Sequence, residues 1–343
     1  MTDRAPLVLL GGSGFVGAAL VRGLQHRGHV LRVADLAPST VAPHTWVRAD
    51  VRDAESVSAA LDGAETLFLL AAEHGMEPRP AHRYEETNVG GARAVVTAAR
   101  RTGLRRIVFT STVAVYGLGR GVVTEESPTA PASAYGRTKL AAEALLRAWA
   151  DEDGARSLVI VRPTVVFGSG GRHGNSALFH LLAQPGFRMV GDGRARKSFA
   201  HVENVAAFLA HTASLGSGVH LFNYADGPDL TMAELAAVVR KAVGVGPALP
   251  SRPRWRALSR AALQQALVPF GGPRPDLTVQ QLRRFCADSR FISVRTAGTG
   301  FSAPLSLADA LERFARSDLR WTAGHPAVGA VHSRAIRGDA VAS

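Results

Sequence analysis

Cysteine and lysine are the residues that this sequence uses least. Its 343 residues contain one cysteine, Cys286, so no disulfide can form within the chain and nothing in the sequence requires an oxidising compartment. Basic residues are plentiful, with 40 lysines and arginines together, yet only Lys139, Lys197 and Lys241 are lysines. Because arginine serves wherever a general cation suffices, each lysine is a candidate for a specific role.

Long apolar runs are also missing. No run approaches the ~18 residues that a membrane-spanning helix requires, and the first residues, MTDRAPLVLLGG, lack a basic segment followed by a cleavable apolar stretch. We therefore expect no membrane span, no membrane partner and no signal peptide, and a cytoplasmic protein. Histidine, cysteine and aspartate do not cluster at metal-ligand spacing, so we expect no catalytic metal.

The net charge is +12, and most of it lies in the last quarter of the chain. Residues 252–343 contain 14 arginines and 6 acidic residues, without a run of basic residues or a zinc-binding pattern. Such a spread is typical of a solvated surface or of a region that meets a small acidic substrate, and we expect no nucleic-acid partner.

The chain alternates short apolar runs with helical patterns, which predicts a parallel, doubly wound α/β sheet. The expected strands lie at 7–10, 29–34, 45–48, 66–71, 106–110 and 158–161, and the expected helices at 55–61, 88–101 and 135–150. After Pro163 glycine-rich turns become frequent, as expected where a second, smaller lobe begins. We predict a first domain over 1–166 to which 194–222 return, a substrate lobe over 167–193 and 223–322, and a disordered tail over 323–343.

A glycine-rich turn joins the first strand to the first helix. Gly11, Gly14 and Gly17 allow a tight turn, close approach of a pyrophosphate to backbone N–H groups, and packing of helix on strand. Asp35 ends the second strand, where a carboxylate can accept hydrogen bonds from the adenosine ribose and repel a 2′-phosphate. This favours NAD over NADP. Asp50 closes the third strand, where either an adenine contact or a helix cap is expected.

Tyr135 and Lys139 open a helix four residues apart, so they share one face. There the ammonium could lower the pKa of the tyrosine and hold a ribose. Thr112 follows the preceding strand and should bring its hydroxyl to the same edge of the sheet. Together these three residues form a candidate proton-transfer set.

With these motifs the chain resembles the extended short-chain dehydrogenase/reductase family, in its branch of NAD-dependent nucleotide-sugar epimerases and dehydratases. The resemblance covers about residues 6–320 and is carried by GGSGFVG at 11–17, LAA at 70–72, TNVGG at 87–91, FTSTVAVYG at 109–117, VRPTVVFG at 161–168 and SFAHVENV at 198–205. It implies a Rossmann-type fold, bound NAD and a sugar nucleotide between two lobes. The residues that it adds to the NAD site are Phe15, Val16, Val51, Leu70, Ala71, Ala72, Asn88, Thr110, Pro163 and Val165.

Two positions depart from the family's pattern, and they reduce the number of reactions that this protein could catalyse. The family's dehydratases carry an Asp-Glu pair directly after the catalytic threonine, and its decarboxylases need a glutamate there, whereas this chain has Val113 and Ala114. Neither side chain can transfer a proton, so an epimerase, dehydrogenase or ketoreductase remains. A 3β-hydroxysteroid-type dehydrogenase or secondary-metabolism ketoreductase is the alternative enzyme, and a dinucleotide-sensing binding protein is the non-enzymatic one.

The resemblance also suggests substrate contacts. Lys197 stands where the epimerases carry a basic residue that meets the diphosphate, and Arg196 could assist it or the position could be an exposed basic turn. Thr164 replaces an asparagine that is frequent in uridine-nucleotide epimerases. His74 follows the LAA segment and could line the substrate. His201 could do so too, or be an ordinary core residue.

A homodimer is expected from the same family, which pairs the two helices represented here by 88–101 and 135–150. Both helices carry apolar residues in excess of one core-facing stripe, and these would leave a large apolar patch on a monomer. The residues concerned are Val95, Val96, Leu140, Leu145, Leu146 and Trp149.

We predict that the protein prefers NAD to NADP and that Asp35→Ala weakens this preference. The substitution removes both the ribose acceptor and the charge that repels a 2′-phosphate. Dissociation constants of the two cofactors, measured by titration calorimetry for both proteins, check this. Equal affinities in the wild type would contradict the assignment of Asp35.

Overall fold

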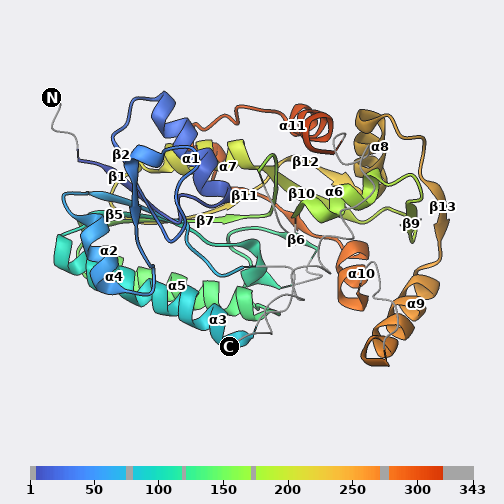
Figure 1. The fold of residues 1–343 in the computed structure, drawn as a ribbon, viewed down its shortest axis with the longest axis horizontal. Helices are drawn as coiled ribbons and strands as arrows, with labels where there is room; N and C mark the ends of the chain where they lie inside the picture. Colours follow the sequence, from blue (N-terminus) through green and yellow to red (C-terminus); the bar gives the residue numbers. More distant parts are fainter. Residues whose placement is uncertain (1–4, 75–79, 118–120, 171–174, 271–277, 320–343) are drawn as a thin grey trace, which may run out of the picture.

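The computed structural model describes residues 5–74, 80–117, 121–170, 175–270 and 278–319. Its central element is a parallel sheet of seven strands in the order β11-β7-β5-β4-β1-β2-β3 (Figure 1). These strands are β1 (Leu7–Leu10), β2 (Leu31–Asp35), β3 (Trp46–Arg48), β4 (Thr66–Leu69), β5 (Arg106–Thr110), β7 (Ser157–Pro163) and β11 (Gly218–Tyr224). The order reverses between β1 and β4, as in a doubly wound sheet, so the fold class expected from the sequence is confirmed.

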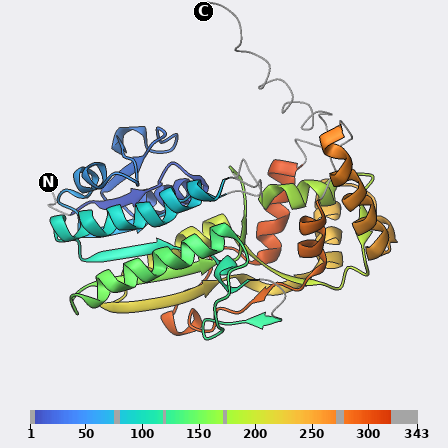
Figure 2. The same cartoon turned by 90° about the horizontal axis from the view of Figure 1, so that it is seen from below.

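Helices cover both faces of this sheet, and Figure 1 shows one helical layer above the strands and the other below them. Figure 2 views the molecule from below, with the lower helical layer in front of the strands. One face packs on α1 (Phe15–His26) and α7 (Val202–Thr212). The other packs on α2 (Ala54–Leu61), α4 (Gly91–Thr102) and α5 (Ala134–Asp151). Strands between two helical layers are apolar on both sides, and every residue of β7 is buried.

A second lobe has its own apolar core, built on Phe167, Phe179, Phe199 and Phe314. Its β8 (Val165–Phe167), β10 (Arg196–His201) and β12 (Asp226–Thr231) form one small sheet, and β9 (Arg188–Val190) and β13 (Leu249–Arg252) form another. Its helices are α6 (Asn175–Ala183), α8 (Met232–Val243), α9 (Arg254–Leu267), α10 (Val279–Cys286) and α11 (Leu307–Phe314). Figure 1 shows them grouped at one end of the molecule.

Short elements connect the two parts. Strands β6 (Val122–Val123) and β14 (Arg290–Phe291) pair with each other. The remaining helices are α3 (Ala81–Tyr84), a π-helix η2 (Glu85–Gly90), the 3₁₀ helices η1 (Pro43–Thr45), η3 (Val113–Tyr116), η4 (Val268–Phe270) and η5 (Ala297–Thr299), and a π-helix η6 (Ala315–Leu319). Within the described ranges no helix has the length and apolar character to cross a membrane.

The domain boundaries expected from the sequence remain a proposal. Helix α7 and strand β11 lie with the first core, whereas β10 pairs with β8 and β12 in the second lobe. The expected disordered tail at 323–343 lies outside the described residues.

The apolar patch expected on α4 and α5 is absent, and that part of the dimer argument is wrong. Val95, Val96, Leu146 and Trp149 are buried in the core of the chain itself, and Leu145 packs against that core while Leu140 is half-buried. The two helices pack on the sheet, on each other and on α2. Their wide apolar stripes are therefore buried within a single chain. The homodimer then rests on family resemblance alone.

The tight packing of α1 on β1 gives a stability test with an internal control. A Cβ at Gly17 would lie 2.5 Å from Gly11 O, whereas a Cβ at Gly23 of the same helix meets nothing within 4 Å. We predict that Gly17→Ala destabilises the protein by about 1–3 kcal/mol and that Gly23→Ala stabilises it by about 0.5–1 kcal/mol. Denaturant unfolding of both variants checks this, and equal effects would contradict it.

Candidate active site

The glycine turn and the segment after β4 meet at the carboxyl edge of the sheet. Gly11 has a φ of +90°, and a Cβ there would lie 2.3 Å from Ala71 N. The N–H groups of Leu70 and Ala71 both donate to Leu10 O at 2.8 Å. Parallel topology therefore brings two segments sixty residues apart into contact, and the predicted NAD residues of the 70–72 segment border the turn.

Asp35 reaches this turn from the end of β2. One carboxylate oxygen accepts from Ser13 N at 3.0 Å, and the other accepts from Ala37 N at 3.1 Å. The hydrogen bond from Ser13 N thus ties the glycine turn to the end of β2. Each oxygen retains a further lone pair, which a ribose hydroxyl could use.

The turn has the features that a dinucleotide pyrophosphate needs. Gly14 is the N-cap of α1, and no side chain caps its N–H groups. Those donors, with the positive end of the helix dipole, suit an anion. Phe15 and Val16 begin the helix. At the end of β5, Thr110 Oγ1 is buried with no hydrogen-bond partner among the described residues, which leaves it for a ligand. These residues fit NAD.

Asp50 and Val51 lie farther along the same edge. The carboxylate of Asp50 pairs with the guanidinium of Arg52, with Nη2 at 2.6 Å, and this hydrogen bond lowers the pKa of Asp50. Val51 packs against Gly91 at the start of α4. Asp50 therefore braces its own loop, and its adenine contact stays a prediction.

Asn88 ties two loops together. Its amide oxygen accepts from Glu73 N at 2.9 Å, and its amide nitrogen donates to Glu73 O at 3.1 Å and Thr138 Oγ1 at 3.0 Å. The segment after β4 is thereby tied to α5. Its expected contact with NAD would act alongside this positioning role.

Tyr135 and Thr112 come together as the sequence predicts. Ser133 caps α5 by accepting from Gly136 N at 3.1 Å, which places Tyr135 in the first turn of the helix. A Cβ at Gly136 would lie 2.5 Å from Ala114 O, so only glycine lets α5 approach η3 this closely. This approach brings the phenol of Tyr135 close enough to the side chain of Thr112 for Thr112 to lower its pKa.

Burial sets the protonation of both titratable residues in this set. It raises the pKa of Tyr135 from 10.0 to about 12, against a smaller lowering by the Thr112 hydrogen bond. Lys139 is 1% exposed with Nζ 4.0 Å from the centre of the Phe109 ring, and burial lowers its pKa from 10.5 to about 7. The expected lowering of the tyrosine pKa by Lys139 is not found, because burial dominates the pKa of Tyr135 and Lys139 is not among the groups that shift it.

A buried ion pair beneath this set was missed from the sequence. Glu143, one turn after Lys139, accepts from Arg162 of β7 through Nε at 2.9 Å and Nη2 at 2.5 Å. The exposed fractions of the two side chains are 2% and 5%. Ser111 Oγ also donates to Glu143, at 2.5 Å. The four-residue spacing of Tyr135, Lys139 and Glu143 places all three on one helical face and could have revealed the glutamate.

The same network reaches the last strand of the sheet. Arg162 Nη1 donates to Tyr116 Oη at 2.8 Å, and this hydroxyl donates to Asn223 Oδ1 at 2.8 Å. Asn223 N in turn donates to Glu125 at 2.9 Å. Every charge in this chain of contacts has a partner, as a buried network requires.

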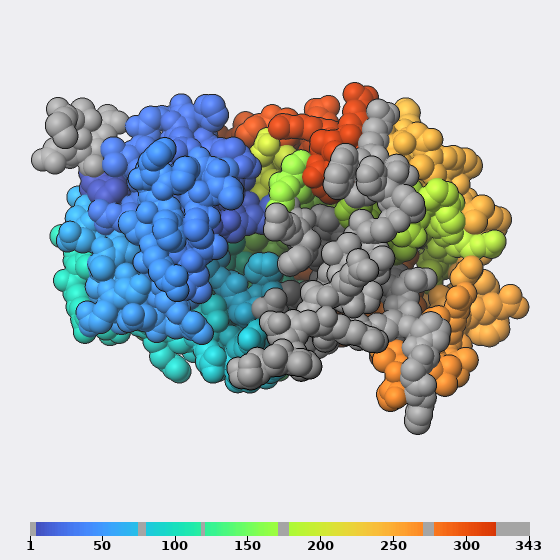
Figure 3. Space-filling model, in the orientation of Figure 1, coloured from blue at the N-terminus to red at the C-terminus, as the bar shows by residue number. Residues whose placement is uncertain are grey.

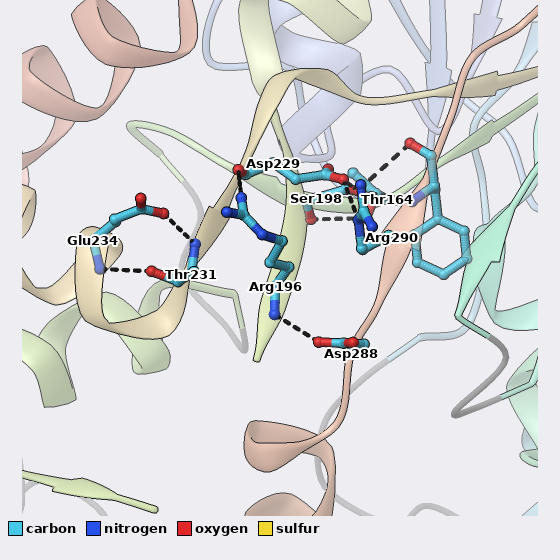
Figure 4. A network of polar contacts seen from close by, with 9 residues as sticks. Thr164, Arg196, Ser198, Asp229, Thr231, Glu234, Asp288 and Arg290 are labelled. Carbon is cyan, nitrogen blue, oxygen red and sulfur yellow. Dashed lines mark hydrogen bonds and ion pairs between the residues drawn. The ribbon is translucent and has the colours of Figure 1, made fainter. Parts of the chain in front are cut away.

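Two of the predicted substrate residues, Thr164 and Arg196, lie in a separate polar network (Figure 4). Thr164 Oγ1 donates to Ser198 O at 3.0 Å, and Arg196 donates through N to Asp288 at 2.7 Å and through Nη1 to Asp229 O at 3.1 Å. Asp229 also pairs with Arg290 at 3.0 Å. These bonds fasten β10 to β12 and to the segment that follows α10.

Lys197 caps a helix in this structure. Its ammonium donates to Arg284 O at 2.6 Å, to Ala287 O and to Ser289 Oγ at 3.3 Å, at the C-terminal end of α10. These are the carbonyls that a helix end leaves without partners, and a cation there also complements the helix dipole. A diphosphate contact, which stays a prediction, would require some of these bonds to break.

The remaining predicted residues divide between core and surface. Pro163 is buried at the end of β7, and Val165 is exposed on β8. His74 is exposed at the end of a described range. His201 is buried, with its ring against Phe167, and so fits the core interpretation. The described residues contain no group of histidine, cysteine or acidic side chains that could hold a metal.

Comparison with known proteins agrees with this geometry. Residues 7–223 match the model of the NAD dependent epimerase/dehydratase family, which is more than half of the chain. The chain belongs to this family. Its glycine turn and its Tyr135/Lys139 helix both fall within the matched range.

Relatives within the family differ in what their names say they act on. The chain is 34% identical, over 90% of its length and 93% of the relative's, to the N-acetyl-α-D-glucosaminyl-diphospho-ditrans,octacis-undecaprenol 4-epimerase of Escherichia coli O157:H7. It is 29% identical to a 3β-hydroxysteroid dehydrogenase/Δ5→4-isomerase of Mycobacterium tuberculosis, over 84% of each chain. Among solved structures, MoeE5 in complex with UDP-glucuronic acid and NAD matches with a TM-score of 0.70 and 25% identity, over 93% of this chain and 99% of the other.

The buried ion pair of this epimerase/dehydratase-family protein should carry much of its stability. We predict that Glu143→Gln costs about 3–5 kcal/mol, because Arg162 stays buried without its counter-charge. The matched control is Glu152→Gln, which removes the same charge from the exposed end of α5, where Glu152 pairs with Arg100 and Arg156, and should barely change the melting temperature. Thermal unfolding distinguishes them, and equal shifts would contradict the role of Glu143.

Proposed function

We propose that this protein is an NAD-dependent 4-epimerase whose substrate is a sugar attached to a diphosphate. The observation that carries the proposal is the close approach of α5, which bears Tyr135, to the Thr112 segment at the sheet edge that also holds the glycine turn. Residues of this kind move a proton at a sugar hydroxyl while NAD, when bound, accepts and returns a hydride. The similarity to the Escherichia coli 4-epimerase supports reaction at C4.

Each residue of the set has a distinct task in this proposal. Tyr135 takes the proton from the reacting hydroxyl, and Thr112 hydrogen-bonds the same oxygen. Lys139 holds a ribose of the cofactor from the same face of α5. Val113 and Ala114 supply no acid or base next to Thr112, which favours epimerisation over dehydration.

The relatives support two different groups to which the sugar diphosphate could be attached, a nucleotide or a lipid. MoeE5 was solved with UDP-sugars, which supports a nucleotide carrier, whereas the Escherichia coli relative is named for an undecaprenol carrier. A homodimer belongs to the proposal on family resemblance. A cytoplasmic location belongs to it because the sequence has one cysteine and no long apolar run.

The alternative function is oxidation of a 3β-hydroxysteroid, because relatives with that name match most of the chain. The two functions predict different products. An epimerase returns its cofactor unchanged, whereas a dehydrogenase accumulates NADH. Incubation with UDP-glucose, UDP-N-acetylglucosamine, undecaprenol-diphospho-N-acetylglucosamine and a 3β-hydroxysteroid, followed by mass spectrometry and absorbance of the reduced nicotinamide, separates them.

Tyr135→Phe should lower kcat by about 10²–10⁴-fold and leave NAD binding nearly intact, because the ring still packs but no proton can move. Tyr84→Phe is the matched control, since the Tyr84 ring lies 6.4 Å from that of Tyr135 and is also mostly buried. It should retain most of the activity. Steady-state kinetics on the accepted substrate measure both, and more than about a tenth of wild-type kcat in Tyr135→Phe would remove this residue from the mechanism.

A further inference from the structure

Helix α9 presents apolar side chains to the outside of the molecule. Trp255 is 64% exposed, Leu263 is 62% exposed and Leu267 is 42% exposed, whereas Ala261 is the buried residue of this 14-residue helix. At 3.6 residues per turn, the three large side chains lie together on the side opposite Ala261. The arrangement is the reverse of an ordinary surface helix, whose apolar stripe faces the core.

Packing within the protein does not account for the outward-facing apolar residues of α9. The apolar cores of both lobes are built without any residue of Arg254–Leu267. Figures 1 and 3 show α9, in orange, at the margin of the second lobe, far from the large sheet. Among the described residues its main contacts are with α10 and the 3₁₀ helix that follows, and Arg254 lines a pocket with Val190 and Cys286. An amphipathic helix with an uncovered apolar face is suited to an external partner.

The charged residues of α9 are all basic. Arg254, Arg256 and Arg260 are exposed on α9, and the guanidinium of Arg256 lies 5.1 Å from the centre of the Trp255 ring. Residues 235–275 contain seven lysines and arginines and no acidic residue. The neighbouring α10 adds two more exposed arginines, Arg283 and Arg284. A partner must therefore combine negative charge with an apolar interior.

A membrane surface with anionic lipids has both properties. Tryptophan and leucine insert at the boundary between headgroups and acyl chains, while arginines that flank them bind lipid phosphates. A second copy of this chain fits poorly, because two such faces would bring like charges together. Nucleic acid fits poorly too, because three large exposed apolar side chains share this face with Arg256 and Arg260.

We propose that α9 lies in the plane of an anionic membrane and places the second lobe against it, so that the protein acts on a sugar diphosphate carried by a membrane lipid. The docking rests on α9 alone; the substrate rests on the proposed 4-epimerase function. The proposal departs from the expectation of no membrane partner, which depended on the absence of a spanning segment. An interfacial helix needs no such segment.

The test is co-sedimentation of the full-length protein with vesicles of phosphatidylcholine, alone or mixed with phosphatidylglycerol. We expect binding to the mixed vesicles that added salt weakens. Arg254→Gln/Arg256→Gln/Arg260→Gln should reduce it about 100-fold, at about fivefold per arginine. Trp255→Ser/Leu263→Ser/Leu267→Ser should reduce it more than about tenfold.

Matched control variants carry substitutions of the same two kinds in the lobe that contains the seven-stranded sheet. Arg22→Gln/Arg27→Gln/Arg93→Gln removes three exposed arginines, and Val30→Ser/Val47→Ser/Val219→Ser removes three exposed apolar side chains. Both should sediment like the wild type. Because α9 adds nothing to either core, its variants should keep the wild-type melting temperature. Loss of fold in them would show instead that α9 is structural and would overturn the proposal.

Other outcomes also decide against it. No sedimentation of the wild type, or equal sedimentation of all variants, overturns docking. Binding to a nucleic-acid duplex that depends on the arginines but not on Trp255 would identify a different partner. Light scattering that shows a dimer dissociating in the Trp255/Leu263/Leu267 variant, without vesicle binding, would assign the face to a second copy.

Activity separates docking from the proposed function. With undecaprenol-diphospho-N-acetylglucosamine in the mixed vesicles, both α9 variants should turn over more slowly than the wild type, and any activity on soluble UDP-N-acetylglucosamine should be unchanged. If no sugar is epimerised but vesicles are bound, the proposed function and the substrate fail and docking stands. Equal rates of wild type and α9 variants on the lipid substrate would overturn the role of docking in catalysis.

Discussion

The buried ion pair between Glu143 and Arg162 joins the helix that carries Tyr135 and Lys139 to the central sheet. Glu143 lies one turn after Lys139 and two turns after Tyr135, so fixing it fixes the rotation of α5 about its axis. Ser111 and Tyr116, from the segment after β5, contact the same pair. One interaction thereby holds the tyrosine helix, the threonine segment and strand β7 in register. A charge pair placed this deep costs desolvation, which its four-fold hydrogen bonding offsets.

The environment of this helix favours the neutral forms of its two titratable side chains. Burial raises the pKa of Tyr135 to about 12 and lowers that of Lys139 to about 7. Both shifts have the same cause, because a charge is poorly solvated there. Glu143 acts in the opposite direction on Lys139 and keeps its pKa from falling further.

Basic residues serve different purposes in the two ends of the second lobe. Near β10, Arg196 and Lys197 are engaged by backbone carbonyls and carboxylates, which leaves them bracing strands and capping a helix. At the far end, the arginines of α9 are exposed beside exposed tryptophan and leucine. The strong positive charge of the chain is thus consistent with a surface role as well as a role toward an acidic substrate.

The sequence by itself determined the parallel sheet, the glycine turn, the placement of Asp35 and the meeting of Tyr135 with Thr112. These features follow from local patterns and from one rule, that parallel strands end at a common edge. Only the tertiary structure decided what covers α4 and α5, whether Lys197 is available to a ligand, how the pKa values of Tyr135 and Lys139 shift, and which face of α9 is turned outward. Burial and pairing depend on segments distant in the chain, such as Arg162 with Glu143 or Ala287 with Lys197, and no spacing in the sequence records those distances.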